Sequence, residues 1–222
     1  MPNLNKTEIT MIMDASGSMG GDRQLSALNG YNEFIQEQKK VPGECTVSLV
    51  FFNSDTYTSY LSKDIREIGD LTTREYVCDG MTALNDAIGK TINQLGTKLE
   101  ALDENDRPGK VIICTITDGE ENSSKEFTLA KVKEMMDHQT EKYGWQFVLM
   151  GAKELNVTEM GHVRGLAATQ TMAVNLDSLV DTRASFSTHS KSVSMYRTGQ
   201  RATMDYSSVV NDVDDKNKYQ TT

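Results

Sequence analysis

The sequence predicts an α/β fold, with an open, mostly parallel, Rossmann-like sheet and helices on both of its faces. Strand-like and helix-like stretches alternate along most of the 222 residues, and this order is typical of parallel sheets. The strand-like runs are nearly continuous in apolar residues apart from Thr and Ser, as expected of strands that helices cover on both faces. The expected central strands are residues 9–13, 45–52, 111–117 and 145–150.

Helices are expected between these strands. Residues 84–99 repeat apolar side chains with the 3.6-residue period of an amphipathic helix. A similar pattern over residues 129–143 predicts a second helix that begins after Thr128 and ends near Gly144. An earlier helix is marked more faintly by Leu25, Leu28 and Ile35.

The rest of the chain gives weaker patterns. Residues 56–77 are expected to form a short edge strand followed by an irregular connection. A last strand is expected over residues 169–174 and a last helix over 176–197, which closes a domain spanning residues 6–198. Residues 199–222 are polar with only scattered apolar positions, so we expect a tail that is disordered or depends on a partner.

Composition argues against several classes of function. A net charge of −9 argues against nucleic acid or anionic lipid as partners, because both bind basic surfaces. No apolar run approaches the ~20 residues of a membrane helix, and the N-terminus lacks the apolar stretch of a secretory signal, so we expect a cytoplasmic protein. The cysteines cannot all pair and share no CxxC spacing, so buried thiols are expected rather than a zinc site: Cys45, Cys78 and Cys114.

Small oxygen-bearing side chains lie in three loops, each at the end of a predicted strand or just before a predicted helix. The first strand ends in Asp14, which is followed by Ser16 and Ser18. A second loop brings Thr82 just before a strong helix, and a third places Asp118 at the end of a central strand. Open α/β sheets bind ligands at the carboxyl ends of their strands. Two carboxylates and three hydroxyls, with no His or Cys, suit a hard cation such as Mg²⁺.

The pattern Asp-x-Ser-x-Ser, a distant Thr and a Thr-Asp-Gly resembles the metal-ion-dependent adhesion site of von Willebrand factor type A domains. The resemblance covers roughly residues 6–198, and all five motif positions are filled. It is similar in particular to small stand-alone bacterial and phage members of the family. The stretches that carry this similarity are residues 9–19, 80–88 and 111–122.

The resemblance implies a role for each motif residue. Ser16 and Ser18 would ligate the metal directly, while Asp14 and Asp118 would act directly or through water. Thr82 would join when the site is ready to bind a ligand. In the family, an open coordination position accepts an acidic side chain from a partner protein.

Taken singly, the pieces of the motif also have structural explanations. Asp14 or Ser16 would cap the first helix, Thr82 would cap the helix that begins near Leu84, and Asp118-Gly119 alone is most often a turn. The ordered set of three strand-to-helix junctions favours the metal site over these explanations. Glu120 and Glu121 border the set, and we expect them to form a solvated loop face.

The leading hypothesis is a non-enzymatic module that uses Mg²⁺, with Mn²⁺ or Ca²⁺ as alternatives, to capture an acidic residue of another protein. Serine hydrolysis is unsupported because Ser16 lacks the Gly-x-Ser-x-Gly elbow, and no phosphate-binding loop is present. Arg23 is the basic residue nearest to the first loop in sequence. Two alternatives stay open: a regulatory or assembly subunit of an ATPase, kinase or phosphatase complex, and a metal-dependent phosphohydrolase.

Overall fold

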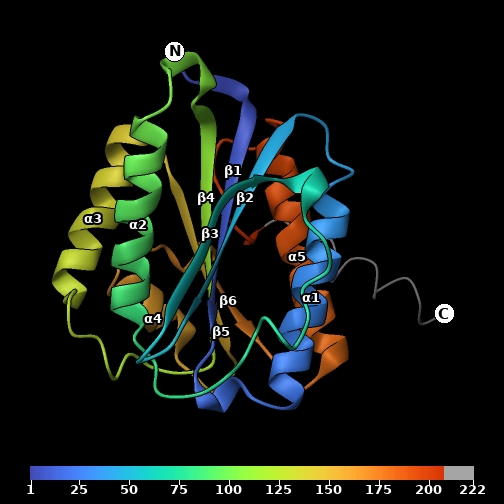
Figure 1. Ribbon diagram of the computed structural model, residues 1–222, viewed down its shortest axis with the longest axis vertical. Coiled ribbons are helices and arrows are strands. Elements are labelled where there is room, and N and C mark those ends of the chain that lie inside the picture. The colour runs from blue at the N-terminus through green and yellow to red at the C-terminus, as the bar shows by residue number, and fades with distance from the viewer. Residues whose placement is uncertain (208–222) are drawn as a thin grey trace.

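The computed structural model describes residues 1–207 and contains one six-stranded sheet between two layers of helices (Figure 1). The strand order is β3-β2-β1-β4-β5-β6, and every neighbouring pair is parallel except β2 and β3. The predicted open, mostly parallel sheet is therefore confirmed. The strands are β1 Asn3–Asp14, β2 Glu44–Phe52, β3 Tyr57–Asp64, β4 Pro108–Thr117, β5 Gln146–Ala152 and β6 Thr171–Val174.

Helices cover both faces of the sheet. One face carries α1 and α5, and the other carries α2 and α3 (Figure 1). The helices are α1 Asp22–Gln38, α2 Leu84–Glu100, α3 Leu129–Tyr143, α4 Val157–His162 and α5 Leu179–Arg197. Short 3₁₀ turns are η1 Gly17–Met19, η2 Ile65–Glu67, η3 Glu104–Asp106 and η4 Ala168–Gln170.

The central strand β1 shows why the strand sequences are nearly continuous in apolar residues. Ile9 and Met11 belong to the core beneath α1 and α5, whereas Ile12 packs into the core beneath α2 and α3. Both sets of side chains are fully buried. The sheet therefore has no solvent-facing side at its centre, which removes the alternation of polar and apolar residues.

The predicted ends of α3 are confirmed by its caps. The Thr128 side chain accepts a hydrogen bond from the backbone nitrogen of Lys131 at 3.2 Å. Gly144 ends the helix in the left-handed region with φ of 69°, where a residue with a side chain would be strained. The edge strand expected within residues 56–77 is β3, which pairs antiparallel with β2.

Two features differ from the expectations. The short helix α4 was not predicted, because six residues are too few to show a helical period. The chain also continues to pack after residue 198, since Met204 and Tyr206 are buried and the Tyr206 backbone nitrogen donates to the Thr169 carbonyl at 2.8 Å. The expected boundary at residue 198 is therefore too early. The rest of the proposed tail, residues 208–222, lies outside the described residues.

Within residues 1–207, no helix has both the length and the apolar character needed to cross a membrane. The cysteines are free thiols: Cys45 and Cys114 are buried and Cys78 is half-buried. Burial raises the pKa of the Cys78 thiol to about 11, so it stays protonated at neutral pH.

Candidate metal centre

The fold brings the five predicted residues to the carboxyl ends of the adjacent strands β1 and β4. Asp14 is the last residue of β1, and Asp118 directly follows β4. Ser16 and Ser18 lie between β1 and α1, and Thr82 lies two residues before α2. The chain leaves β1 toward the face that carries α1 and leaves β4 toward the face that carries α3, and open α/β sheets bind ligands at such switch points.

Hydrogen bonds connect four of the five residues, through side chains and, at Ser16, also through the backbone nitrogen. Ser18 Oγ donates to Asp118 Oδ1 at 2.8 Å, and Ser16 Oγ lies 3.1 Å from Ser18 Oγ. Asp14 is fully buried and accepts from the Ser16 backbone nitrogen at 2.8 Å. Its other oxygen accepts from Thr117 Oγ1 at 2.5 Å. The oxygens therefore form one connected group rather than scattered caps.

The fifth residue, Thr82, is held against the Asp118 loop. Its backbone nitrogen donates to Asn122 Oδ1 at 3.0 Å, and its carbonyl accepts from the Asn122 backbone nitrogen at 3.1 Å. A Cβ atom on Gly119 would lie only 2.8 Å from Thr82 Oγ1. The Thr82 hydroxyl therefore faces the residue after Asp118, and a glycine is needed there for this close approach.

Backbone hydrogen bonds fix the first loop against the second. Gly17 nitrogen donates to the Gly80 carbonyl at 2.9 Å, and Asp79 nitrogen donates to the Ala15 carbonyl at 2.9 Å. The Tyr76 hydroxyl donates to the backbone carbonyl of Asp14. These contacts place the Ser16 and Thr82 segments side by side without using any of the five predicted side chains.

The second and third loops are fixed by reciprocal capping. Glu121 accepts a hydrogen bond from the Asn85 backbone nitrogen at 2.7 Å, in the first turn of α2. In return, Asp86 accepts from the backbone nitrogens of residues 125, 126 and 127 at 2.8 to 2.9 Å. The expectation of a solvated loop face is therefore wrong for Glu121, although Glu120 is exposed. Glu121 and Asp86 position the centre, and their separation in sequence concealed this role.

Burial governs the charge state of Asp14. Burial raises the pKa of Asp14 from 3.8 to about 6, with a smaller contribution from the nearby charge of Asp118, while hydrogen bonds from Thr117 and Ser16 oppose the rise. A buried carboxylate of this kind gains from any cation that binds beside it. The electrostatics therefore favour a cation next to Asp14.

Arg23 contacts the centre in a way that the sequence did not predict. Its NH1 group donates to Asp118 Oδ2 at 2.8 Å, and its Nε group donates to Asp177 Oδ1 at 2.6 Å. Arg23 therefore ties the first turn of α1 to the end of β4 and to the segment before α5. Asp118 Oδ1 is left facing Ser18.

The donor set fits a hard divalent cation. Within residues 1–207, no group of three or more His, Cys, Asp or Glu side chains is arranged to hold a metal ion. The centre instead combines two carboxylates with three hydroxyls, which suits a cation such as Mg²⁺ that binds oxygen and keeps several waters.

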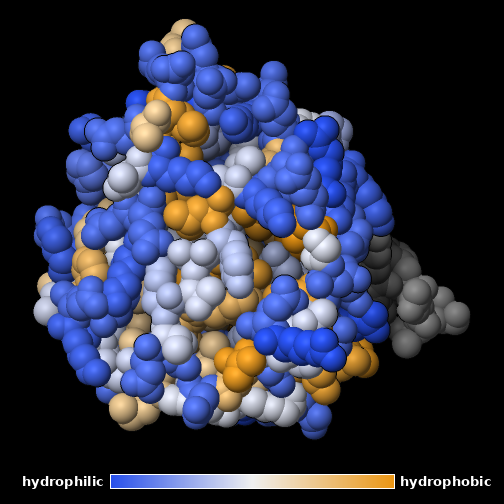
Figure 2. Space-filling model, in the orientation of Figure 1, coloured by the Kyte–Doolittle hydropathy of each residue, from blue (hydrophilic) through white to orange (hydrophobic). Residues whose placement is uncertain are grey.

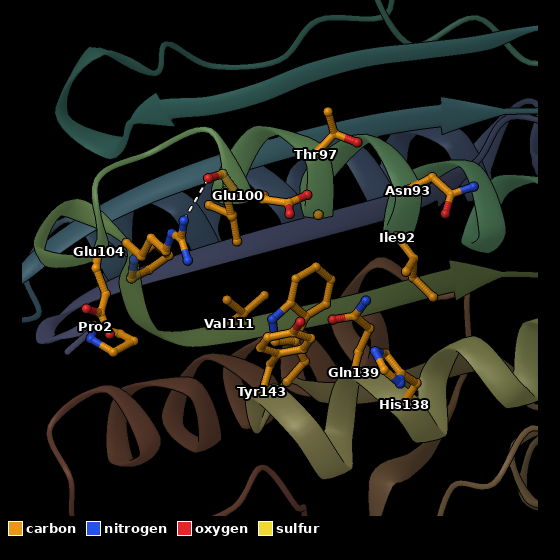
Figure 3. A pocket seen from close by; sticks show the side chains of 15 residues that line it. Pro2, Ile92, Asn93, Thr97, Glu100, Glu104, Val111, His138, Gln139 and Tyr143 are labelled. Carbon is orange, nitrogen blue, oxygen red and sulfur yellow. Dashed lines mark hydrogen bonds between the residues drawn. The ribbon is translucent and has the colours of Figure 1, made fainter.

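A cavity of about 550 Å³ lies elsewhere, between α2 and α3 near the amino end of β4. Figure 3 shows Asn93 and Thr97 from α2 opposite His138 and Tyr143 from α3, with Val111 of β4 at the base. None of the five predicted residues lines this cavity. We place the candidate metal centre at the other end of the sheet because the five oxygen-bearing residues converge there.

No protein-family model matches the sequence, and no curated protein matches it. Solved structures do match the fold. The vWF domain of the type V pilus tip protein Mfa5 from Porphyromonas gingivalis aligns with a TM-score of 0.64 and 11% identity, covering 85% of this chain and 95% of that chain.

Two further structures are similar. The pilus adhesin SpaC from Lactobacillus rhamnosus GG aligns with a TM-score of 0.64 and 13% identity, over 85% of this chain and 30% of that chain. Proximal thread matrix protein 1 from the mussel byssus aligns with a TM-score of 0.57 and 15% identity, over 82% and 45%. This chain thus spans less than half of either protein structure. The topology and these similarities together show that the chain has the von Willebrand factor type A fold.

Proposed function

We propose that the chain is a metal-dependent protein-binding module. A divalent cation, Mg²⁺ in the first instance, binds the five oxygen-bearing residues and captures an acidic side chain of a partner protein. One observation carries this proposal: three loops, fixed to one another by hydrogen bonds, bring two carboxylates and three hydroxyls together at one edge of the sheet. The proposed ligands are Asp14, Ser16, Ser18, Thr82 and Asp118.

The proposed ligands differ in charge and in how they would bind the cation. The hydroxyl oxygens of Ser16 and Ser18 are neutral donors, and the Ser18 proton already points to Asp118. Hydrogen bonds from Ser16 nitrogen and Thr117 Oγ1 orient the Asp14 carboxylate, and its oxygens keep lone pairs that can bind the cation or accept a hydrogen bond from a metal-bound water.

Charge makes capture of an acidic partner depend on the metal. When ionised, Asp14, Asp118 and Asp177 carry three negative charges against one positive charge on Arg23, a formal sum of −2. This sum repels a carboxylate. A bound divalent cation brings the sum to zero and adds an open coordination position, which the incoming carboxylate completes.

The comparisons agree with a binding function. Two of the similar structures are described as a pilus adhesin and a pilus tip protein. The phosphohydrolase alternative is less well supported, because such chemistry uses a cationic group to clamp phosphate. Arg23, the basic residue that contacts Asp118, already pairs with Asp118 and Asp177 and lies 3.9 Å from Glu154.

Affinity capture from a lysate of the native host, in Mg²⁺ and in EDTA, tests the proposal. We expect a partner that is retained in Mg²⁺, released by EDTA, and lost in Asp14→Ala and Asp118→Ala. Asp103→Ala is the control, because Asp103 is an exposed carboxylate near the amino end of β4, away from the charges around Asp118. Partner binding that persists in EDTA and in both ligand variants contradicts the proposal, provided that circular dichroism shows all variants folded.

A further inference from the structure

Large apolar side chains are exposed around the candidate metal centre. Met81 is 56% exposed beside Thr82, and Val77 is 62% exposed in the same connection. Val180, in the first turn of α5, is 75% exposed. Exposed apolar side chains thus lie in the connection before α2, in the first turn of α5 and in the first turn of α1. Together we call them the apolar rim: Leu25, Val77, Met81, Leu179 and Val180.

An ion pair and a hydrogen bond connect the segments that carry the apolar rim. Arg23, in the first turn of α1, pairs with Asp177, which lies just before α5. Its neighbour Gln24 donates a hydrogen bond to the Tyr76 carbonyl, directly before Val77. The first turn of α1 therefore touches both other segments. Figure 2 shows apolar surface beside the lower ends of α1 and α5, among strongly hydrophilic residues.

Exposed carboxylates lie at the same end of the sheet as the centre. They begin α1, follow β2 and β4, and precede α2 and α5, and they repel a partner surface that is broadly acidic. The exposed apolar side chains instead favour a partner that covers them with apolar groups. These exposed acidic residues are Asp22, Asp55, Asp79, Glu120 and Asp177.

We propose that the apolar rim selects the partner: the captured segment carries one acidic side chain flanked by large apolar residues rather than by further acidic ones. This inference rests on the proposed metal-dependent function. The cation would fix the carboxylate, and the rim would contact its neighbours in the partner sequence. The two contributions act on different atoms, so they are separable by mutation.

A displayed library of short random peptides with Asp fixed at the centre tests the inference. The 222-residue chain is used for selection, once in Mg²⁺ and once in EDTA. In Mg²⁺ we expect enrichment of Leu, Ile, Met, Phe or Val beside the fixed Asp, and depletion of Asp and Glu there. The enriched peptides are then measured against Val77→Ser and Met81→Ser, which change exposed side chains.

Each rim variant should weaken peptide binding about tenfold or more while Mg²⁺ binding is unchanged. The matched control is Leu4→Ser, an exposed apolar residue near the start of β1. Selection that depends on Mg²⁺ but shows no apolar preference, or rim variants that bind the peptides normally, overturns this inference alone. Absence of any Mg²⁺-dependent selection contradicts the proposed function itself, and with it this inference.

Discussion

Replacing Asp14 by Asn separates the stability of the centre from its capacity to bind a cation. Asp14 is fully buried, with one oxygen accepting from Ser16 nitrogen and the other from Thr117 Oγ1. Asn retains an oxygen for Ser16 and supplies an amide donor to Thr117. The Thr117 hydrogen can then turn to the Gly119 carbonyl, 3.0 Å away. The substitution therefore removes the charge with little change in packing or hydrogen bonding.

The pKa of Asp14 determines how much the substitution changes the free energy of unfolding. Burial raises that pKa from 3.8 to about 6 in the folded chain. The folded state thus retains a proton that the unfolded chain loses, and stability falls as the pH rises through about 6. Each pKa unit corresponds to about 1.4 kcal/mol, so the ionised carboxylate destabilises the metal-free protein by about 3 kcal/mol above this pH.

Urea unfolding in EDTA across this pH range measures the effect. Asp14→Asn should be more stable than the wild type by up to about 3 kcal/mol above pH ~7, and the two should converge below pH ~4. Adding Mg²⁺ should stabilise the wild type and leave the variant unchanged. A variant that is less stable than the wild type at every pH in EDTA refutes this description of a buried carboxylate whose charge is unfavourable.

Three further predictions concern other parts of the chain. Burial also raises the pKa of Glu8, so Glu8→Gln should be more stable than the wild type in urea above that pKa, and equal to it in acid; a constant difference across pH contradicts this. Gly89→Ala places a Cβ 2.5 Å from the Phe127 ring and should destabilise the fold by about 1–3 kcal/mol. In the same helix, a Cβ at Gly96 meets nothing within 4 Å, so Gly96→Ala should stabilise the fold by about 0.5–1 kcal/mol. Arg23→Gln removes a positive charge beside Asp118, so calorimetry should find severalfold tighter Mg²⁺ binding that loses its advantage at high salt; weaker binding would show that Arg23 supports the site instead.

The fold was largely predictable because its signals are local. The runs that became β1 and β4 are apolar on both faces, and the caps of α3 lie at its own ends. The folded segment after residue 198 was missed because only Met204 and Tyr206 anchor an otherwise polar stretch. Two apolar side chains carry no periodicity, and their burial depends on the strand and helix that they meet.

The candidate ligands were predictable for a similar reason, since Asp14, Ser16 and Ser18 stand in one short motif. The residues that position them were not. Arg23 meets Asp118 across 95 positions, and Asn85 meets Glu121 across 36. Such pairs form only when the sheet brings distant loops together, so no spacing in the sequence predicts them.

Calorimetric titration of Mg²⁺ into protein stripped with EDTA tests the proposal that the five oxygen-bearing residues form one divalent-cation site. We expect one bound Mg²⁺ per chain in the wild type and in Asp103→Ala, and no binding in Asp118→Ala. A wild type that binds no Mg²⁺, Mn²⁺ or Ca²⁺, or an Asp118→Ala variant that binds as the wild type does, contradicts it.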